Sequence, residues 1–403
     1  MAADEVRRHN LGTVLERLHL AGPLSRSSLT KATGLNRSTI ADLLAELTVN
    51  GLVEERPGAP GSGPGRPSPV VQVRPHRASA LAVELAVDSI AVATVGLGGH
   101  AYNLVRVARP RGRFSPEETV QDVAKLAGPL LDSLPAEHRL VGVGVAVVGI
   151  TRRSDGFVHL APNLGWRDVP LASMLASELD LGAPVLAANE ADLGALAEHR
   201  RGRQPGVANL VYISGEVGIG AGVIVDGKPL LGSAGYAGEA GHTLVNPDGS
   251  VCRCGAVGCW ETEAGEGALL RRAGVPEGTG RLDEVAERAA AGDEPTLRAI
   301  AEVGRWLGLG IGNLINLFNP DLVVLGGLYQ RLFTFLEPSV LEGARHQALQ
   351  APHQTVTIGC SGLGPDASLV GAAELVMSRV IADPANFDGP SVRGRASAQR
   401  SVR

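Results

Sequence analysis

Helical spacing of apolar residues marks the beginning of the chain. A first helix is predicted by four positions at that spacing: Leu11, Val14, Leu15 and Leu18. Ser25 is suited to cap a short second helix that ends at Gly34, and Asn36 is suited to cap a third. The third helix carries apolar residues at the i, i+3, i+4 and i+7 positions: Ile40, Leu43, Leu44 and Leu47. A short helix, a glycine turn and a longer amphipathic helix together predict a helix-turn-helix.

Two short extended runs follow, at 52–55 and 70–73, and a loop rich in glycine and proline joins them, as in a wing. The third helix is then the natural recognition helix. Its first turn presents three polar residues that can reach base edges or phosphates in a major groove: Arg37, Ser38 and Thr39. Arg66, at the tip of the loop, is placed to enter a minor groove. The alternative is a small three-helix bundle that contacts other proteins.

From Ala80 onward, short runs rich in valine and alanine alternate with helical stretches. Strands are predicted at 81–85, 90–95, 141–147, 186–188, 210–213, 221–225 and 322–325. Strands that alternate with helices favour an α/β protein. A length of 403 residues is enough for two or three domains.

The composition is that of an ordinary globular protein, with 44% hydrophobic and 20% charged residues. No apolar run is long enough to cross a membrane and no signal peptide opens the chain, so we expect no membrane partner. With few cysteines, this predicts a reduced, cytoplasmic setting. The net charge of −5 is uneven, because residues 1–77 carry ten Lys and Arg against seven Asp and Glu. A basic first domain on an acidic body suggests nucleic-acid binding.

Three of the four cysteines lie close together in the sequence: Cys252, Cys254 and Cys259. His242 precedes the first of them by ten positions. One histidine and three cysteines make the ligand set of a closed, tetrahedral, structural Zn²⁺ site. The alternative is a disulfide with a stray thiol, or three buried free cysteines. Cys360 is far away in sequence, and disulfide frameworks belong to small secreted domains, so zinc is favoured.

Two sequence motifs contain these candidate ligands: GEAGH at 238–242 and CRCGAVGCWE at 252–261. Together they resemble the signature of the ROK family of bacterial sugar kinases and sugar-responsive repressors. The beginning of the chain, including GRP in the wing, is similar to the winged helix fused to ROK repressors. The resemblance implies an α/β protein with an N-terminal winged helix-turn-helix and a two-lobed, actin-like (ribonuclease-H-like) ROK domain with a structural zinc. We expect DNA binding from residues 1–76, sugar sensing from 78–383, and a disordered tail at 384–403.

The resemblance also implies a sugar site. Glu239, His242 and Glu261 would hydrogen-bond a hexose-like ligand, and carboxylates are suited to accept from pairs of hydroxyls. Asn163 lies in APNLGW, which is similar to the sugar-contact loop of the family although one residue shorter. Asn189 and Glu190 stand where the kinases have Asn-Asp, with Glu190 at the position of the kinase base. We expect Glu190 to act as a hydroxyl acceptor, the alternative being a solvated or capping carboxylate, and we expect no catalytic residue.

The phosphate-binding patterns of the kinases are not preserved. The Asp-x-Gly-x-Thr turn reads ELAVD here, so that Ala86 replaces the glycine and the threonine hydroxyl is missing. The second glycine-rich turn has Val217 in place of threonine and adds the charge of Glu216. The base position has an extra methylene in Glu190, and misplacement by about an ångström can cost on the order of a hundredfold in rate. These departures indicate a cleft that retains sugar contacts and lacks ATP chemistry.

The sequence therefore predicts a sugar-responsive transcriptional regulator and no enzyme. Its expected partners are operator DNA, a sugar or sugar-phosphate effector, and further copies of itself in a dimer or a dimer of dimers. The first alternative is a ROK sugar kinase, fused to a DNA-binding domain, that phosphorylates a hexose with ATP. The second is a body without a small effector that docks a protein, as some ROK repressors dock a sugar-transport protein.

Overall fold

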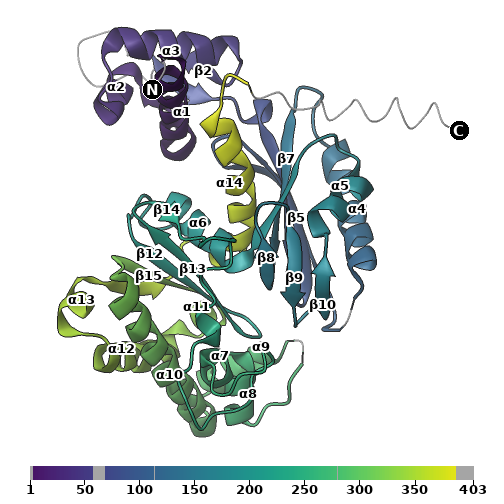
Figure 1. Ribbon diagram of the computed structural model, residues 1–403, viewed down its shortest axis with the longest axis vertical. Helices are drawn as coiled ribbons and strands as arrows, with labels where there is room; N and C mark the ends of the chain where they lie inside the picture. The colour runs from purple at the N-terminus through teal and green to yellow at the C-terminus, as the bar shows by residue number, and fades with distance from the viewer. Residues whose placement is uncertain (1–2, 58–68, 113, 279, 387–403) are drawn as a thin grey trace, which may run out of the picture.

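A computed structural model describes residues 3–57, 69–112, 114–278 and 280–386. The chain folds as an N-terminal unit of three helices and a small sheet, followed by two α/β lobes (Figure 1). None of the helices in the described part of the chain combines the length and the hydropathy needed to span a bilayer. Arg66 and most of the expected tail, 387–403, lie outside the described residues.

The N-terminal unit follows the predicted elements closely. Ser25 accepts a hydrogen bond from the Ser28 amide (3.0 Å), and Asn36 Oδ1 accepts one from the Thr39 amide (2.8 Å), so both predicted caps are confirmed. Gly34 ends the second helix with φ at 71°, a conformation that suits glycine. The helices are α1 (Ala3–Ala21), α2 (Arg26–Thr33) and α3 (Arg37–Val49), and the strands β1 (Leu24–Ser25), β2 (Val53–Arg56) and β3 (Val70–Val73) pair antiparallel in the order β1-β3-β2.

The first lobe is built on a five-stranded sheet in the order β11-β7-β4-β5-β6. Alternate residues of its strands pack on α4 and α5 on one face and on α14 on the other. A second sheet, β10-β9-β8, extends this lobe. The elements are β4 (Ser79–Leu85), β5 (Ser89–Gly96), β6 (His100–Ala108), α4 (Pro116–Asp132), β7 (Leu140–Val147), β8 (Ile150–Arg152), β9 (Phe157–Ala161), β10 (Trp166–Val169), α5 (Leu171–Leu179), β11 (Val185–Asn189) and α14 (Ala367–Ala382).

The second lobe has a sheet in the order β14-β13-β12-β15-β16, with α10 and α12 packed on one face. Helix α6 (Glu190–Arg201) lies on the other face and separates this sheet from α14. The strands are β12 (Leu210–Gly215), β13 (Ile219–Val225), β14 (Lys228–Pro229), β15 (Leu322–Gly327) and β16 (Thr357–Cys360); the helices are α7 (Trp260–Ala264), α8 (Glu266–Ala273), α9 (Arg281–Ala290), α10 (Glu294–Phe318), α11 (Leu328–Arg331), α12 (Phe333–Gln347) and α13 (Gln350–Thr355).

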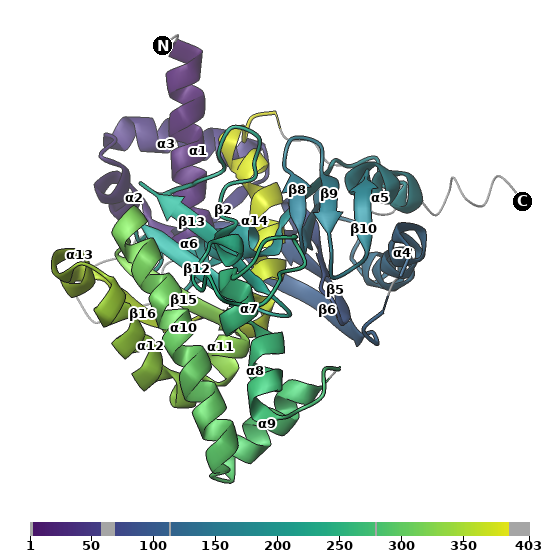
Figure 2. The same ribbon diagram turned by 60° about the horizontal axis from the view of Figure 1, so that its bottom comes forward.

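One hydrophobic core continues from the N-terminal unit into the first lobe. The buried leucines of α1 and α3 belong to the same cluster as Ala80 and Ala82 of β4, Leu193 and Leu196 of α6, and the apolar face of α14. Helices α1 and α14 approach so closely that a methyl group on Gly12 would lie 2.5 Å from the carbonyl oxygen of Ile381. In Figure 2 the first turns of α1 project away from the lobes, while its other end approaches them. The N-terminal unit is thus packed onto the body.

Candidate functional site

A cavity of about 490 Å³ opens between the two lobes and is lined by residues of both. Its size falls in the range of small-molecule sites in proteins. The six residues for which the sequence predicts sugar contacts all line it: Asn163, Asn189, Glu190, Glu239, His242 and Glu261. Residues up to 98 positions apart in the sequence are therefore brought to one site, as the prediction requires.

Asn189 and Glu190 enter the cavity at the first turn of α6. The Asn189 side chain caps this helix by accepting from the amides of Ala191 (2.8 Å) and Asp192 (3.3 Å), and its Nδ2 donates to the carbonyl oxygen of Gly149 (3.0 Å). Gly149 has φ at 103°, so the chain turns there in a conformation that favours glycine. The cap fixes the asparagine and directs the neighbouring Glu190 toward the cavity.

The Glu190 carboxyl group has an unusual environment. Its Oε2 is buried and has no hydrogen-bond partner among the described residues. Burial, followed by the charges of Glu216, Glu239 and Asp192, raises the pKa of Glu190 to about 8. With the cavity empty, a pKa raised in this way favours the protonated form of Glu190 at neutral pH. The expectation that Glu190 accepts from a ligand hydroxyl group stays a prediction.

Two cavity residues, Glu239 and Glu261, lie on either side of the three cysteines in the sequence. Glu239 lies just before a short 3-10 helix, Ala240–His242, and burial raises its pKa. Glu261 lies in α7, and a Cβ on Gly218 would collide with its carboxylate. Gly218 thus makes room for the Glu261 carboxylate in the cavity.

His242, Cys252, Cys254 and Cys259 bring their ligand atoms within 4.8 Å of one another. Cys252 Sγ is 3.6 Å from His242 Nδ1, and Cys254 Sγ is 3.7 Å from Cys259 Sγ. A tetrahedron with metal–sulfur bonds of about 2.3 Å and metal–nitrogen bonds of about 2.0 Å has edges of about 3.5 to 3.8 Å, so this donor set fits a metal ion of that kind. All four cysteines of the chain are free thiols.

The metal cluster and the cavity share a wall. His242 and Glu261 belong to the cavity lining, and Glu261 Oε1 lies 3.0 Å from Cys252 Sγ. Arg253, between two of the cysteines, donates from Nη1 to Asn163 Oδ1, which belongs to the opposite lobe. A metal ion here would hold the loop that carries these cavity residues.

The phosphate side of the cavity contains ion pairs that the sequence did not predict. Arg111 donates from both terminal nitrogens to Glu266 of α8 (2.6 and 3.1 Å) and from Nη2 to Asp88 (3.2 Å). Arg106 donates from Nη1 to Glu84, the residue that replaces the kinase aspartate, and from Nη2 to Asp366 (3.0 Å). Internal carboxylates thus neutralise Arg111, which lines the cavity, and Arg106.

Glu216 adds acid to the same side. Its side chain reaches the solvent of the cavity, yet removal from bulk water and the charges of Glu84, Asp88 and Glu266 raise its pKa to about 8. The two glutamates and the aspartate around it would oppose a triphosphate at close range. Ala86 and Val217 offer no hydroxyl groups there, as predicted.

The candidate DNA-contacting residues lie far from the cavity, at the start of α3. Arg37 and Ser38 are exposed and Thr39 is half-buried. Ser38 Oγ donates to the capping Asn36 Oδ1 (2.8 Å). Arg66 lies outside the described residues.

Comparisons with known proteins agree with this arrangement. The sequence profile of the ROK family matches residues 80–379. A xylose repressor of Caldicellulosiruptor bescii is 31% identical over 376 residues, which cover 90% of this chain and 93% of the relative. A glucokinase of Halalkalibacterium halodurans is 33% identical over 271 residues, or 62% of this chain and 82% of the enzyme. A solved ROK family transcriptional regulator, a homologue of the E. coli Mlc protein, superposes with a TM-score of 0.76 at 26% identity, covering 95% of this chain and 98% of that one.

Proposed function

The chain belongs to the ROK family, and from this premise we propose that it is a transcriptional repressor that binds operator DNA and senses a sugar. The proposal assigns DNA binding to residues 1–76 and sensing to residues 78–383. The similarity to the xylose repressor extends over the N-terminal unit as well as the lobes, whereas the similarity to the glucokinase covers 62% of the chain.

We favour a sensor over a kinase because the two sides of the cavity differ in the polar groups that they offer to a ligand. The sugar side has hydrogen-bonding groups from both lobes. The phosphate side has Arg111 and Arg106 already paired with carboxylates. Phosphoryl transfer depends almost wholly on contacts with phosphate and magnesium, so an internally neutralised phosphate side removes its main source of catalysis.

A neutral sugar suits the cavity better than a sugar phosphate. Six glutamates line it, against three arginines, of which Arg111 is paired with Glu266 and Arg253 donates to Asn163. Hydroxyl groups can both donate to and accept from such a lining, whereas a phosphate dianion meets mostly acceptors of its own charge. Asn189, Glu239 and the free ring nitrogen of His242 are the groups we assign to sugar hydroxyls.

We assign a structural Zn²⁺ to His242, Cys252, Cys254 and Cys259. Three thiolates and one imidazole leave no open position for water, so the ion would act through the position of the loop and not through chemistry on a ligand. For DNA, we assign Arg37, Ser38, Thr39 and Arg66 as contacts. A homo-oligomer, at least a dimer, would place two winged helices on a symmetric operator.

The test combines two measurements on the purified full-length protein. Thermal shift with D-xylose, D-glucose, N-acetylglucosamine and their phosphates identifies the effector, and mobility shift on the upstream region of its own gene reports DNA binding with and without it. Glu239→Ala should abolish the thermal shift and leave DNA binding of the sugar-free protein intact. Absence of any sugar-induced shift, together with DNA binding, would instead favour the protein-docking alternative.

The kinase alternative has a specific observation in its favour, which is the 33% identity to a glucokinase. Coupled ADP release with magnesium, ATP and the same sugars decides it. Turnover near the enzyme median of roughly ten per second would overturn the proposal.

A further inference from the structure

Helix α6 links the cavity to the N-terminal unit. Its first residue, Glu190, lines the cavity behind the capping Asn189, and its last two residues are Arg200 and Arg201. Twelve residues at about 1.5 Å each make a rod of about 18 Å. One regular element therefore carries sugar-side residues at one end and two cations at the other.

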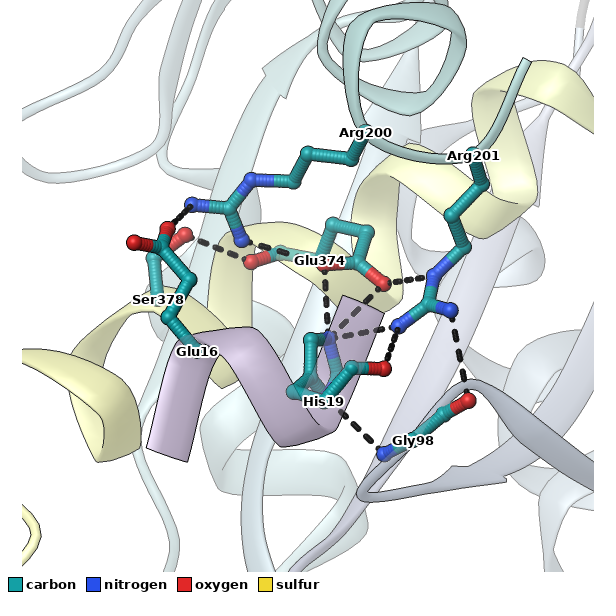
Figure 3. Close-up of polar contacts among 7 residues, drawn as sticks. All are labelled: Glu16, His19, Gly98, Arg200, Arg201, Glu374 and Ser378. Atoms are coloured by element: carbon teal, nitrogen blue, oxygen red, sulfur yellow. Dashed lines mark hydrogen bonds and ion pairs between the residues drawn. The ribbon is translucent and has the colours of Figure 1, made fainter. Parts of the chain in front are cut away.

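The two cations meet a buried carboxylate. Glu374 of α14 has a side chain that is 1% exposed, and Arg200 Nη1 (3.0 Å) and Arg201 Nε both donate to it (Figure 3). His19 of α1 completes the set, with Nε2 at 3.0 Å from Glu374 Oε2. Although burial opposes ionisation, the hydrogen bond from His19 and the charges of both arginines hold the pKa of Glu374 well below its usual range. Three helices from distant parts of the chain thus meet at one ionised group.

The turn between β5 and β6 fixes the histidine. The Gly98 amide donates to His19 Nδ1 (2.8 Å), and His19 Nε2 lies 2.6 Å from Arg201 Nη2 and 3.2 Å from Glu374 Oε1. Arg201 donates from Nη1 to the Gly98 carbonyl oxygen (3.2 Å) and from Nη2 to the His19 carbonyl oxygen (3.4 Å). Arg201 therefore touches α1, α14 and the first lobe at once. We call His19, Gly98, Arg200, Arg201 and Glu374 the Glu374 cluster.

Close packing leaves α6 little room to bend or slide alone. Cβ atoms on Gly222 of β13 or Gly371 of α14 would collide with the α6 carbonyl oxygens of Ala191 and Leu193. The helix is therefore in backbone contact with the second lobe on one side and with α14 on the other. A displacement at its first turn is transmitted to Arg201, because closely packed elements move as units.

Building on the proposed function, we propose that α6 transmits occupancy of the cavity to the N-terminal unit, and that the Glu374 cluster holds that unit in place while the cavity is empty. Sugar contacts with Asn189 and Glu190 shift α6 together with the elements packed on it, the contacts of Arg201 with His19 and Gly98 are broken, and the N-terminal unit is released from its fixed orientation. Arg201 is the positioning residue of this device, since it alone in the cluster bonds both His19 and Glu374 from α6.

Hydrogen exchange on the full-length protein tests the device. Arg201→Ala removes the hydrogen bonds from Arg201 to His19, Gly98 and Glu374, while Arg200 and His19 still contact Glu374, so the fold is retained. Arg201→Lys keeps the positive charge but loses the several donors of the guanidinium group. Arg288→Ala is the matched control, because Arg288 pairs with Glu284 within α9, away from the cluster. Without sugar, amides near the end of α1 should exchange about tenfold faster in Arg201→Ala than in the wild type or the control.

The sugar response separates coupling from simple stability. With D-xylose or D-glucose as the probe, exchange should change in the first turn of α6 in every variant, but in α1 only in the wild type and the control, with Arg201→Lys intermediate. Equal α1 exchange in Arg201→Ala and wild type without sugar would overturn the holding role. An α1 response that survives in Arg201→Ala would overturn the transmission. If neither sugar changes exchange in the wild-type cavity, the proposed sensing fails, and the sugar-free comparison still decides the holding role.

Discussion

Carboxyl groups of the cavity lie next to the thiols of Cys252 and Cys254, and the charge of the site depends on which of these groups are protonated. Glu190 and Asp192 have pKa values raised to about 8 and 7, mainly by burial, and removal from bulk water raises the pKa of Glu216 to about 8 although its side chain reaches the cavity solvent. A carboxyl group whose pKa is raised binds its proton more tightly in the folded state. It stabilises the fold at low pH, and this contribution is lost as the pH rises from the unfolded value near 4.5 toward 8.

Glu190→Gln tests this charge state. The amide cannot ionise, so the variant should lose less thermal stability than the wild type between pH 5.5 and pH 8.5. We expect a relative gain in Tm on the order of 2–5 °C at pH 8.5 and little difference at pH 5.5. Thermal melts across this range provide the measurement. Parallel pH profiles for the two proteins would show that Glu190 is ionised when the cavity is empty.

Removal of one metal ligand is the second test at this scale. Cys252→Ser should reduce bound zinc from one per chain to nearly none and should lower sugar affinity, because the loop that carries His242 and Glu261 loses its support. Cys360→Ser is the control, as Cys360 is the cysteine outside the cluster. Elemental analysis after gel filtration measures the ion. Full zinc content in Cys252→Ser would contradict the assignment.

At the scale of single elements, helices with local signals were predictable. The capping side chains of Ser25 and Asn36 indicate the starts of two helices. The apolar runs of β4, β5 and β7 indicate strands that are buried on both faces. Strand β6, His100–Ala108, was missed because it is an edge strand that is mostly exposed and carries no continuous apolar pattern. With it the sequence analysis missed Arg106 and, just beyond, Arg111.

The cavity residues were predictable for a different reason. Asn163, Glu239 and Glu261 lie in motifs whose family resemblance implies a common site, and the structure brings them together. The Glu374 cluster has no motif. His19 and Glu374 are 355 positions apart, and nothing local in either helix indicates that the two side chains meet. The chemistry of motifs can be read from sequence, whereas pairing between distant helices depends on the complete packing.

Helix α3 provides the prediction that belongs to this scale. Arg37→Ala should weaken operator binding by about 1–3 kcal/mol and relax one base position if Arg37 reads a base, or weaken all sequences equally if it contacts phosphate. Titration of operator and scrambled DNA at two salt concentrations distinguishes the cases. Arg298→Ala, which changes an exposed side chain of α10, should leave affinity unchanged. Unaltered binding by Arg37→Ala on every sequence would show that α3 is not the recognition helix.

At the scale of the whole molecule, two polar contacts join the lobes across the cavity, Arg111 with Glu266 and Arg253 with Asn163. The first is bidentate, and the Glu266 side chain is only 3% exposed. Such a pair holds the two lobes together at the cavity, since both residues line it.

Arg111→Ala should therefore loosen the lobes without creating an enzyme. We expect a Tm lower by several degrees, because Glu266 is left buried without its counterion. ADP release should stay at background, since Ala86 and Val217 still lack phosphate contacts. Calorimetry and the coupled assay give the two readings. Substantial ADP release by Arg111→Ala would show that one ion pair alone separates this cleft from a kinase.

The packing of α1 on α14 also has a consequence during synthesis of the chain, because the two helices leave the ribosome far apart in time. Helix α1 packs on α3 within the N-terminal unit, whereas the helix of the body on which it docks, α14, consists of residues 367–382. At about 5–20 residues per second, a ribosome needs roughly 20 to 70 s to reach them after α1 has emerged. During that interval the N-terminal unit of the nascent chain is not yet docked on the lobes. A product truncated before residue 367 would carry an N-terminal unit that lacks its contacts with α14.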